Sequence, residues 1–175
     1  YTCSHCAHFA EEAYGPLKRD YIAKGLVALE LRNLIRDQFD LTAALLARCG
    51  GPSRVFTLTE DMLARQEVWV AEGQVVVIRQ EAQWKSMPMV RQLQTLAKGS
   101  GLLQMAQARG VAPAQANACL ASDQMNKTLL AMTKDAVDNR NINATPSFLI
   151  NDQPGPRSST WEDLEAALRT ALNAR

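Results

Sequence analysis

Apolar residues recur along most of the chain with the spacing of amphipathic helices. Near the start they step by four residues, at Phe9, Ala13, Leu17 and Tyr21. This period predicts a helix with one buried face and a charged opposite face. Pro16 lies inside the pattern and should kink or divide the helix, and Gly25 should end it.

Two short apolar runs depart from the helical spacing and predict strands. Residues 26–31 read Leu-Val-Ala-Leu-Glu-Leu, and because this run lacks in–out alternation we expect a largely buried strand. Residues 145–150 begin Thr-Pro, and a strand tolerates proline at its first position. Residues 75–78 are also β-branched but lie among helical patterns, so we predict helix or irregular structure there.

Between the two predicted strands, cap and stop residues divide a long stretch of helical patterns. Asp40 is the predicted N-cap of a helix through Cys49, and Thr57 opens a capping-box pattern with Glu60. Further boundaries are expected at Gly99, Gly110, Pro113 and Asp123, and a last helix should run from Ser159 or Thr160 to about Ala174. This stretch therefore reads as α-helical throughout.

The order of the predicted elements is helix, strand, helical block, strand and helix. This order fits an α/β layer that carries an inserted α-helical domain. We predict residues 1–39 as the first part of the layer, 40–140 as the inserted helical domain and 141–175 as the second part. Because two strands are too few to cover these helices, we expect further strands to precede Tyr1.

The composition supports a folded domain and excludes several function classes. The 175 residues are 47% hydrophobic and 21% charged, whereas disorder needs few apolar residues and a high net charge. A formal charge of +1 gives no footprint for nucleic acid or an anionic membrane. The sequence shows no Gly-rich phosphate loop, paired-carboxylate motif or HExxH metal motif.

The four cysteines carry the candidate chemistry. Cys3 and Cys6 open the first helix, where residues i and i+3 share a face and lie within reach of a disulfide. The N-terminus of a helix stabilises a thiolate at Cys3, and a protonated His5 would add positive charge beside it. Cys6 lies one turn further in and should stay protonated. Stabilising the reduced form makes the disulfide a stronger oxidant, so we expect the pair to donate a disulfide.

Two other functions of the pair remain open at this point. Cys3, Cys6 and His8 could be part of a zinc site, although a second ligand pair with similar spacing is missing from the sequence. The pair could also be an inert structural disulfide. Cys49 and Cys119 are isolated cysteines that read either as two buried thiols or as a second, non-catalytic disulfide.

Residues 1–9 resemble the active-site segment of the DsbA family of bacterial thiol oxidases, which have a thioredoxin fold. Residues 144–151 resemble the loop in which a cis-proline of that family faces the two cysteines, and the element order also matches. The resemblance implies that Cys3 attacks, that Cys6 resolves and that His5 is the histidine of the oxidising members. It further implies that Pro146 is the cis-proline and that Thr145 pairs its backbone with an extended substrate.

The same resemblance implies a biological setting. We expect a periplasmic oxidase, exported by a signal peptide that residues 1–175 do not include, which oxidises unfolded or reduced exported proteins. A membrane quinone-linked thiol oxidase would reoxidise it. No metal, organic cofactor or nucleic acid is expected, and we expect a monomer. Some relatives carry an extra bridge, so the Cys49–Cys119 disulfide is also implied.

Two departures from the family pattern keep alternatives open. Ser4 stands where the strongest oxidants carry proline, and threonine before the cis-proline also occurs in isomerases. A disulfide isomerase or reductase on the same fold is therefore the first alternative. A non-enzymatic zinc- or peptide-binding module is the alternative from another class.

Overall fold

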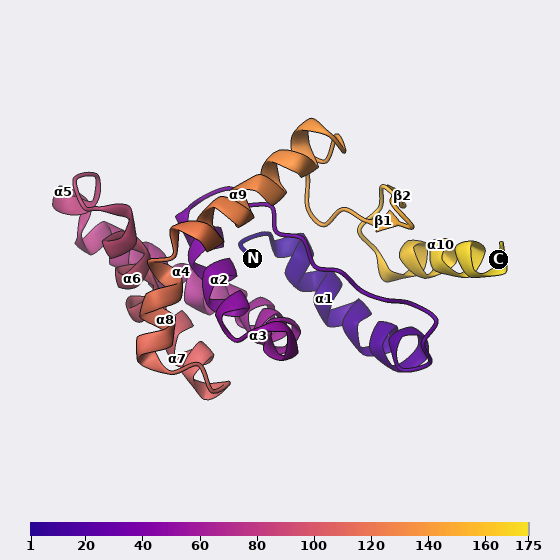
Figure 1. Cartoon of the computed structure of the whole chain (residues 1–175), viewed down its shortest axis with the longest axis horizontal. Coiled ribbons are helices and arrows are strands. Elements are labelled where there is room, and N and C mark those ends of the chain that lie inside the picture. Colours follow the sequence, from indigo (N-terminus) through magenta and orange to yellow (C-terminus); the bar gives the residue numbers. More distant parts are fainter. Residues whose placement is uncertain (175) are drawn as a thin grey trace.

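The structure is a computed structural model that describes residues 1–174, and it is mostly helical (Figure 1). Its elements, in chain order, are α1 (Ser4–Pro16), η1 (Leu17–Ile22), α2 (Gln38–Cys49), α3 (Pro52–Ala64), α4 (Gln66–Arg79), α5 (Glu81–Trp84), α6 (Met89–Gly99), α7 (Leu102–Ala108), α8 (Pro113–Leu120), α9 (Asp123–Asp138), β1 (Leu149–Ile150), β2 (Gln153–Pro154) and α10 (Trp161–Asn173). No helix in the described range is long and apolar enough to span a bilayer.

The first helix changes its winding at Pro16, as the sequence predicts. α1 ends at Pro16 and continues as the π-helix η1. Proline lacks a backbone N–H and its ring clashes with the preceding turn, so the regular α pattern cannot pass through it. Gly25 follows with a φ of 68°, a left-handed conformation that glycine adopts without a steric penalty.

The strand predicted at residues 26–31 is absent, and this prediction is wrong. The segment is irregular, and Leu26 and Leu29 are 44% and 37% exposed. A strand needs a hydrogen-bonded neighbour, and no described segment pairs with this one. It is held instead by the Arg48 guanidinium of α2, which donates to the Leu31 carbonyl oxygen over 2.8 Å.

Of the second predicted strand, residues 145–150, only Leu149–Ile150 is a strand, and it forms part of a short hairpin. β1 pairs antiparallel with β2, with Leu149 opposite Pro154 and Ile150 opposite Gln153. The two turn residues, Asn151 and Asp152, have φ values of 51° and 62°. Asn and Asp tolerate this region better than other non-glycine residues, so the local sequence favours the turn.

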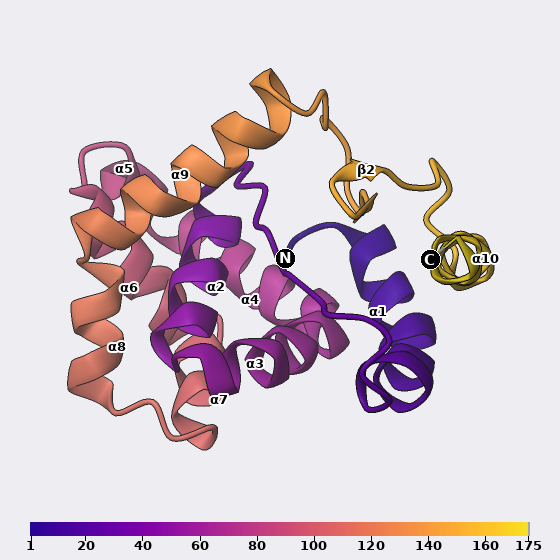
Figure 2. The ribbon, with the colours of Figure 1, turned by 45° about the vertical axis from the view of Figure 1, so that its right-hand side comes forward.

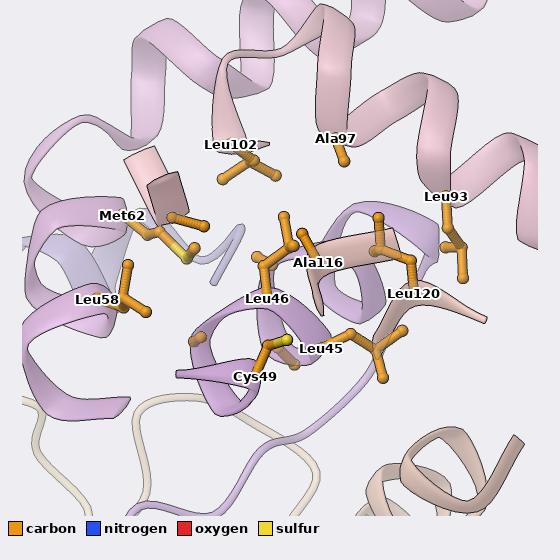
Figure 3. Close-up of a cluster of buried hydrophobic side chains, with 14 of the residues drawn as sticks. Leu45, Leu46, Cys49, Leu58, Met62, Leu93, Ala97, Leu102, Ala116 and Leu120 are labelled. Carbon is orange, nitrogen blue, oxygen red and sulfur yellow. The ribbon is translucent and has the colours of Figure 1, made fainter. Parts of the chain in front are cut away.

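Helix α2 forms the centre of a helical block that contains α2 to α9. Nine of its twelve residues are buried, because α3, α6, α7, α8 and α9 surround it. Figure 3 shows Leu45 and Leu46 of α2 among side chains of α3, α6, α7 and α8, which include Leu58, Leu93, Leu102 and Leu120. A disulfide joins Cys49 of α2 to Cys119 of α8, which is the pairing that the resemblance implies.

A second, smaller cluster joins α1 and η1 to α10. It consists of Phe9, Ala13, Leu17, Tyr21, Leu164 and Leu168, with Phe148 and Ile150 packed against it. α1 also packs against α3, and Figure 2 shows it lying between the helical block and α10. The N-terminus of α1 therefore stands where the two clusters meet. The predicted limits at residues 39/40 and 140/141 stay a prediction.

Several helix starts differ from those predicted. Asp37, not Asp40, caps α2: its carboxylate accepts the N–H of Asp40 over 2.8 Å, and Asp40 itself is buried. α3 begins at Pro52, so Thr57 lies inside the helix, because Gly51 and a first-turn proline provide an earlier start. Ser122 rather than Asp123 caps α9.

The other boundaries follow the sequence. Residues 75–78 are helical, α6 ends at Gly99, Pro113 opens α8 and Thr160 caps α10. These signals lie within one turn of the boundary that they set.

Candidate active site

Cys3 is the N-cap of α1, and Cys6 is its third residue. The Cys3 backbone is extended, with a φ of −82° and a ψ of 117°, and its carbonyl oxygen accepts the N–H groups of Cys6 (3.0 Å) and Ala7 (3.3 Å). Both cysteines are free thiols and only partly buried. The side chain of Cys3 makes no capping hydrogen bond, but the N-cap position places it at the positive end of the α1 dipole, which favours a negative charge.

The proline loop meets this helix end, although 142 residues separate it from Cys3. The Thr145–Pro146 peptide bond is cis, and the Cys3 thiol donates a hydrogen bond to the Thr145 carbonyl oxygen over 3.1 Å. Phe148, two residues after Pro146, packs against Phe9 of α1 in a tilted arrangement, with ring centroids 4.7 Å apart. The structure thus brings Cys3, Cys6, Thr145 and Pro146 together.

The environment lowers the pKa of the Cys3 thiol from 9.0 to about 7. Burial alone would raise this pKa, but polar contacts with the Thr145 side chain, the backbone and thiol of Cys6 and the backbone of His5 outweigh it. The hydrogen bond to the Thr145 carbonyl favours the protonated thiol, so ionisation of Cys3 also releases this contact. A large fraction of Cys3 is therefore thiolate near neutral pH.

Cys6 has the opposite character. Burial raises its pKa from 9.0 to about 11, and the negative charge of a Cys3 thiolate raises it further. At neutral pH one thiol of the pair can attack as a thiolate, while the other holds its proton. This asymmetry is what disulfide exchange through a mixed disulfide needs.

The two histidines near the site have different surroundings. His5 is exposed on the first turn of α1, between the two cysteines. His8 is also exposed and lies 3.2 Å from the Glu12 carboxylate, with which it pairs when protonated. In the described residues, no three His, Cys, Asp or Glu side chains lie close enough to hold a metal ion, so Cys3, Cys6 and His8, the alternative zinc ligands considered from the sequence, do not form such a group.

Sequence reasoning missed two buried polar side chains that hold the residues before α1. Asp40 accepts hydrogen bonds from the backbone N–H (2.9 Å) and the hydroxyl (3.1 Å) of Thr2. Gln66, the first residue of α4, donates to the carbonyl oxygens of Tyr1 (2.5 Å) and Cys3 (2.9 Å). The sequence singled out Asp40 only as a helix N-cap, and it offered no signal that distinguished Gln66 from other glutamines.

A groove of about 740 Å³ runs along α1 beside the cysteines. One wall is α1 with the start of η1, from Ser4 to Lys18, and the other is the end of α3 and the start of α4. Its lining mixes apolar side chains such as Leu63 and Val68 with charged ones. The exposed side of the active-site helix therefore borders an open depression.

Comparisons with known proteins point to one family. A family model described as thioredoxin matches residues 1–170. Putative protein-disulfide oxidoreductases of Rickettsia bellii and Rickettsia felis are each 29% identical over 150 residues, which is 86% of this chain and 49% and 46% of those proteins. The chain thus spans about half the length of the curated relatives it matches.

Two solved structures have the same fold. The crystal structure of a protein-disulfide isomerase from Novosphingobium aromaticivorans superposes with a TM-score of 0.87 at 31% identity, and the match covers 99% of this chain and 88% of that one. Wolbachia pipientis alpha-DsbA1 superposes with a TM-score of 0.74 at 16% identity, over 99% and 82% of the two chains. With the family match over nearly its whole length, the chain belongs to the thioredoxin family.

Proposed function

We propose that the chain is a thiol:disulfide oxidoreductase in which Cys3 and Cys6 exchange a disulfide with protein substrates. The observation that carries the proposal is the contrast between the two thiols at one helix end, where the pKa of Cys3 is about 7 and that of Cys6 about 11. The position of the Thr145–Pro146 loop beside Cys3 and the similarity to protein-disulfide oxidoreductases support it.

In the oxidising direction a substrate thiolate attacks the Cys3 sulfur of the Cys3–Cys6 disulfide. The Cys3–Cys6 bond breaks, a mixed disulfide forms, and Cys6 leaves as a thiolate that takes up a proton. A second substrate thiolate then attacks the substrate sulfur and releases Cys3 as a stabilised thiolate. The substrate loses two electrons and gains a disulfide, and the Cys3–Cys6 pair gains both electrons.

The low pKa of Cys3 supports the oxidase direction. A thiol that ionises readily stabilises the dithiol form, and this raises the tendency of the disulfide to accept electrons. We therefore propose a periplasmic oxidase of unfolded or reduced exported proteins. Its proposed reoxidant is a membrane quinone-linked thiol oxidase, and both proposals rest on the DsbA resemblance. The chain is proposed to act as a monomer, without a metal or organic cofactor.

The proposed residue roles rest on this geometry together with the DsbA resemblance. Cys3 is the proposed attacking cysteine, Cys6 the resolving one, and His5 the histidine that lies between them at the start of α1. The Thr145 backbone, next to Pro146, is proposed to pair with an extended substrate segment. In the reduced structure its carbonyl accepts the Cys3 thiol instead.

A disulfide isomerase is the second candidate function. The observation that favours it is the 31% identity to a structure titled protein-disulfide isomerase. An isomerase acts in its reduced form on a substrate that already has wrong disulfides, whereas an oxidase acts in its disulfide form on a reduced substrate. The two candidates therefore need different starting redox states.

The reduction potential of the Cys3–Cys6 pair tests the direction. Equilibration with glutathione buffers should place it well above the roughly −270 mV of thioredoxin, toward the roughly −120 mV of a strong oxidase. A value at or below that of thioredoxin would overturn the oxidase assignment. A reduced, unfolded dithiol substrate then separates the candidates, since only an oxidase forms the substrate disulfide in one stoichiometric turnover.

A Cys6→Ser variant tests the residue roles. The reduced variant is mixed with a substrate that carries a disulfide, so that the Cys3 thiolate attacks one substrate sulfur and the other leaves as a thiolate. Without the resolving thiol, this mixed disulfide between Cys3 and the substrate should accumulate on a non-reducing gel. Cys3→Ser is the matched control and should trap nothing. A mixed disulfide that forms through Cys6 in the Cys3→Ser variant would contradict the assignment of Cys3 as the attacking residue.

A further inference from the structure

The segment that enters α1 passes between two buried polar side chains of the helical block. Asp40 comes from the first turn of α2, and Gln66 is the first residue of α4. Together they contact the backbone of all three residues that precede the helix. We refer to Asp40 and Gln66 as the entry clamp.

Of the two residues of the entry clamp, Gln66 is the one that contacts Cys3 itself. Its side-chain amide donates to the carbonyl oxygens of Tyr1 (2.5 Å) and Cys3 (2.9 Å), and the residue is only 6% exposed. An amide NH₂ has two hydrogens, so both donors are used. The Cys3 carbonyl also accepts the N–H of Cys6, so Gln66 shares the acceptor that starts the helix.

Asp40 holds the same segment from the side of α2. One carboxylate oxygen accepts the N–H and hydroxyl of Thr2, and the other accepts the Arg36 guanidinium over 3.1 Å. Arg36 also donates to the Thr2 hydroxyl. The Asp40 side chain is 1% exposed, so these contacts have little competition from water.

We propose that Gln66 is a positioning residue for the exchange reaction at Cys3, and this inference rests on the proposed function. Gln66 fixes the carbonyl groups of Tyr1 and Cys3, and so keeps Cys3 in its extended N-cap conformation at the end of α1. In this position the backbone of His5 and Cys6 favours the thiolate and lowers the pKa of Cys3. Losing the contact frees rotation about the Cys3 backbone, and the sulfur then loses part of its hydrogen bonding. The helical block thereby acts on the chemistry although it contributes no reacting atom.

Gln66 is a sharper target than Asp40 because it carries no charge. Replacing Asp40 would leave Arg36 without its partner and alter the electrostatic field at Cys3, whose thiolate interacts with Arg36. Gln66→Met keeps length and volume, removes only the two hydrogen bonds, and leaves His5, Arg36, Asp40 and Cys6 unchanged. A change at Cys3 then reports geometry and not charge.

The test is the ionisation of Cys3 in the reduced, full chain. Thiolate ultraviolet absorbance and the rate of alkylation by iodoacetamide are followed against pH in the wild type and in Gln66→Met. We expect the midpoint to rise by about 0.5 to 1 pH unit, a roughly threefold to tenfold fall in the ionisation constant. Gln66→Asn, whose shorter amide cannot reach both carbonyls, should show a smaller rise and replaces Gln66→Met if that variant does not fold.

Gln92→Met is the matched control. Gln92 is also 6% exposed, and its side chain makes two hydrogen bonds, with Gln38 (2.5 Å) and the Trp84 carbonyl (2.6 Å). It lies on α6, which packs against α2, α4, α7 and α8. This variant should lose thermal stability to a similar extent and keep the wild-type midpoint.

An unchanged midpoint of Cys3 ionisation in the folded Gln66 variants would overturn the proposal. An equal rise of this midpoint in Gln92→Met would also overturn it, because it would show that any loss of stability in the helical block affects Cys3. The measurement needs no substrate. A chain whose Cys3 midpoint depends on Gln66 but that exchanges no disulfides would refute the proposed function and leave the positioning role intact.

Discussion

The free energy of unfolding of the dithiol form, relative to that of the disulfide form, should depend on pH and reach its maximum near pH 9. Cys3 has a pKa of about 7 in the folded chain against an ordinary 9.0, so its contribution is complete above pH 9 and is lost as the pH falls through 7. Cys6 has a folded pKa of about 11 against the same 9.0, so its contribution is present below pH 9 and is lost as the pH rises through 11. Neither group titrates when the disulfide is formed.

The size of the effect follows from the two differences in pKa. For Cys3 the difference corresponds to about 2.7 kcal/mol, and we take about half, roughly 1 to 1.5 kcal/mol, because much of this thiol is open to solvent that screens its interactions. Cys6 is more deeply buried, and its difference corresponds to about 2 to 3 kcal/mol. The dithiol form should therefore gain about 1 kcal/mol relative to the disulfide form from pH 7 to 9, and lose more than that by pH 11.

The assay is urea unfolding of both redox forms across this pH range, with the two free energies subtracted at each pH. Lysines and tyrosines titrate in both forms, so most of their effect cancels in the difference. Each single-cysteine variant keeps one thiol of the pair, and its free energy of unfolding is compared with that of the wild-type disulfide form. Cys3→Ser should keep the fall above pH 9 and lose the rise below it, and Cys6→Ser should do the reverse. A difference that is flat between pH 7 and 9 would refute the assignment of a stabilised thiolate to Cys3.

Two further perturbations test the packing of the helical block. Replacing both Cys49 and Cys119 with Ala should lower the free energy of unfolding by about 4 kcal/mol, since their bond closes a loop with a sequence separation of 70. Disulfide exchange by Cys3 and Cys6 should persist. A loss below about 1 kcal/mol in urea unfolding would contradict the loop-entropy argument. Gly73→Ala should destabilise by about 1 to 2 kcal/mol, because the new Cβ would lie 2.5 Å from the Phe39 ring, an overpacking cost that exceeds the roughly 1 kcal/mol gained in helix propensity. In a Phe39→Leu background, Gly73→Ala should instead stabilise the chain. Thermal melting of the four chains in this double-mutant cycle measures the change in each background. Equal destabilisation in both backgrounds would show that the Phe39 ring is not the obstacle.

Local chemistry was predictable from the sequence because each signal and its effect lie within one turn. The cysteine pair opens α1, Pro16 ends its α-helical winding, and Thr160 caps α10. Each of these depends on a side chain acting on its own neighbouring backbone. The same reasoning predicted helix or irregular structure for the β-branched residues 75–78, and they are helical because their surroundings set the period.

The features that depend on distant partners were predicted less well. Residues 26–31 have the composition of a strand, but a strand forms only where another segment offers paired hydrogen bonds. Asp37 and Asp40 are equally good caps by residue type, and only the fold decides that Asp37 caps α2 while Asp40 turns toward Thr2. Gln66 is one of several glutamines at helix starts, and its role exists only because α4 begins beside Cys3.

The active site is assembled from parts that belong to two separately packed clusters. Cys3 is held by Gln66 of the helical block, whereas Phe148 packs the Thr145–Pro146 loop against the cluster of α1 and α10. The Cys49–Cys119 bond braces only the helical block. On gradual heating, opening of the smaller cluster of α1 and α10 would separate Cys3 from Thr145. Loss of disulfide exchange should therefore precede the cooperative melting of the helical block.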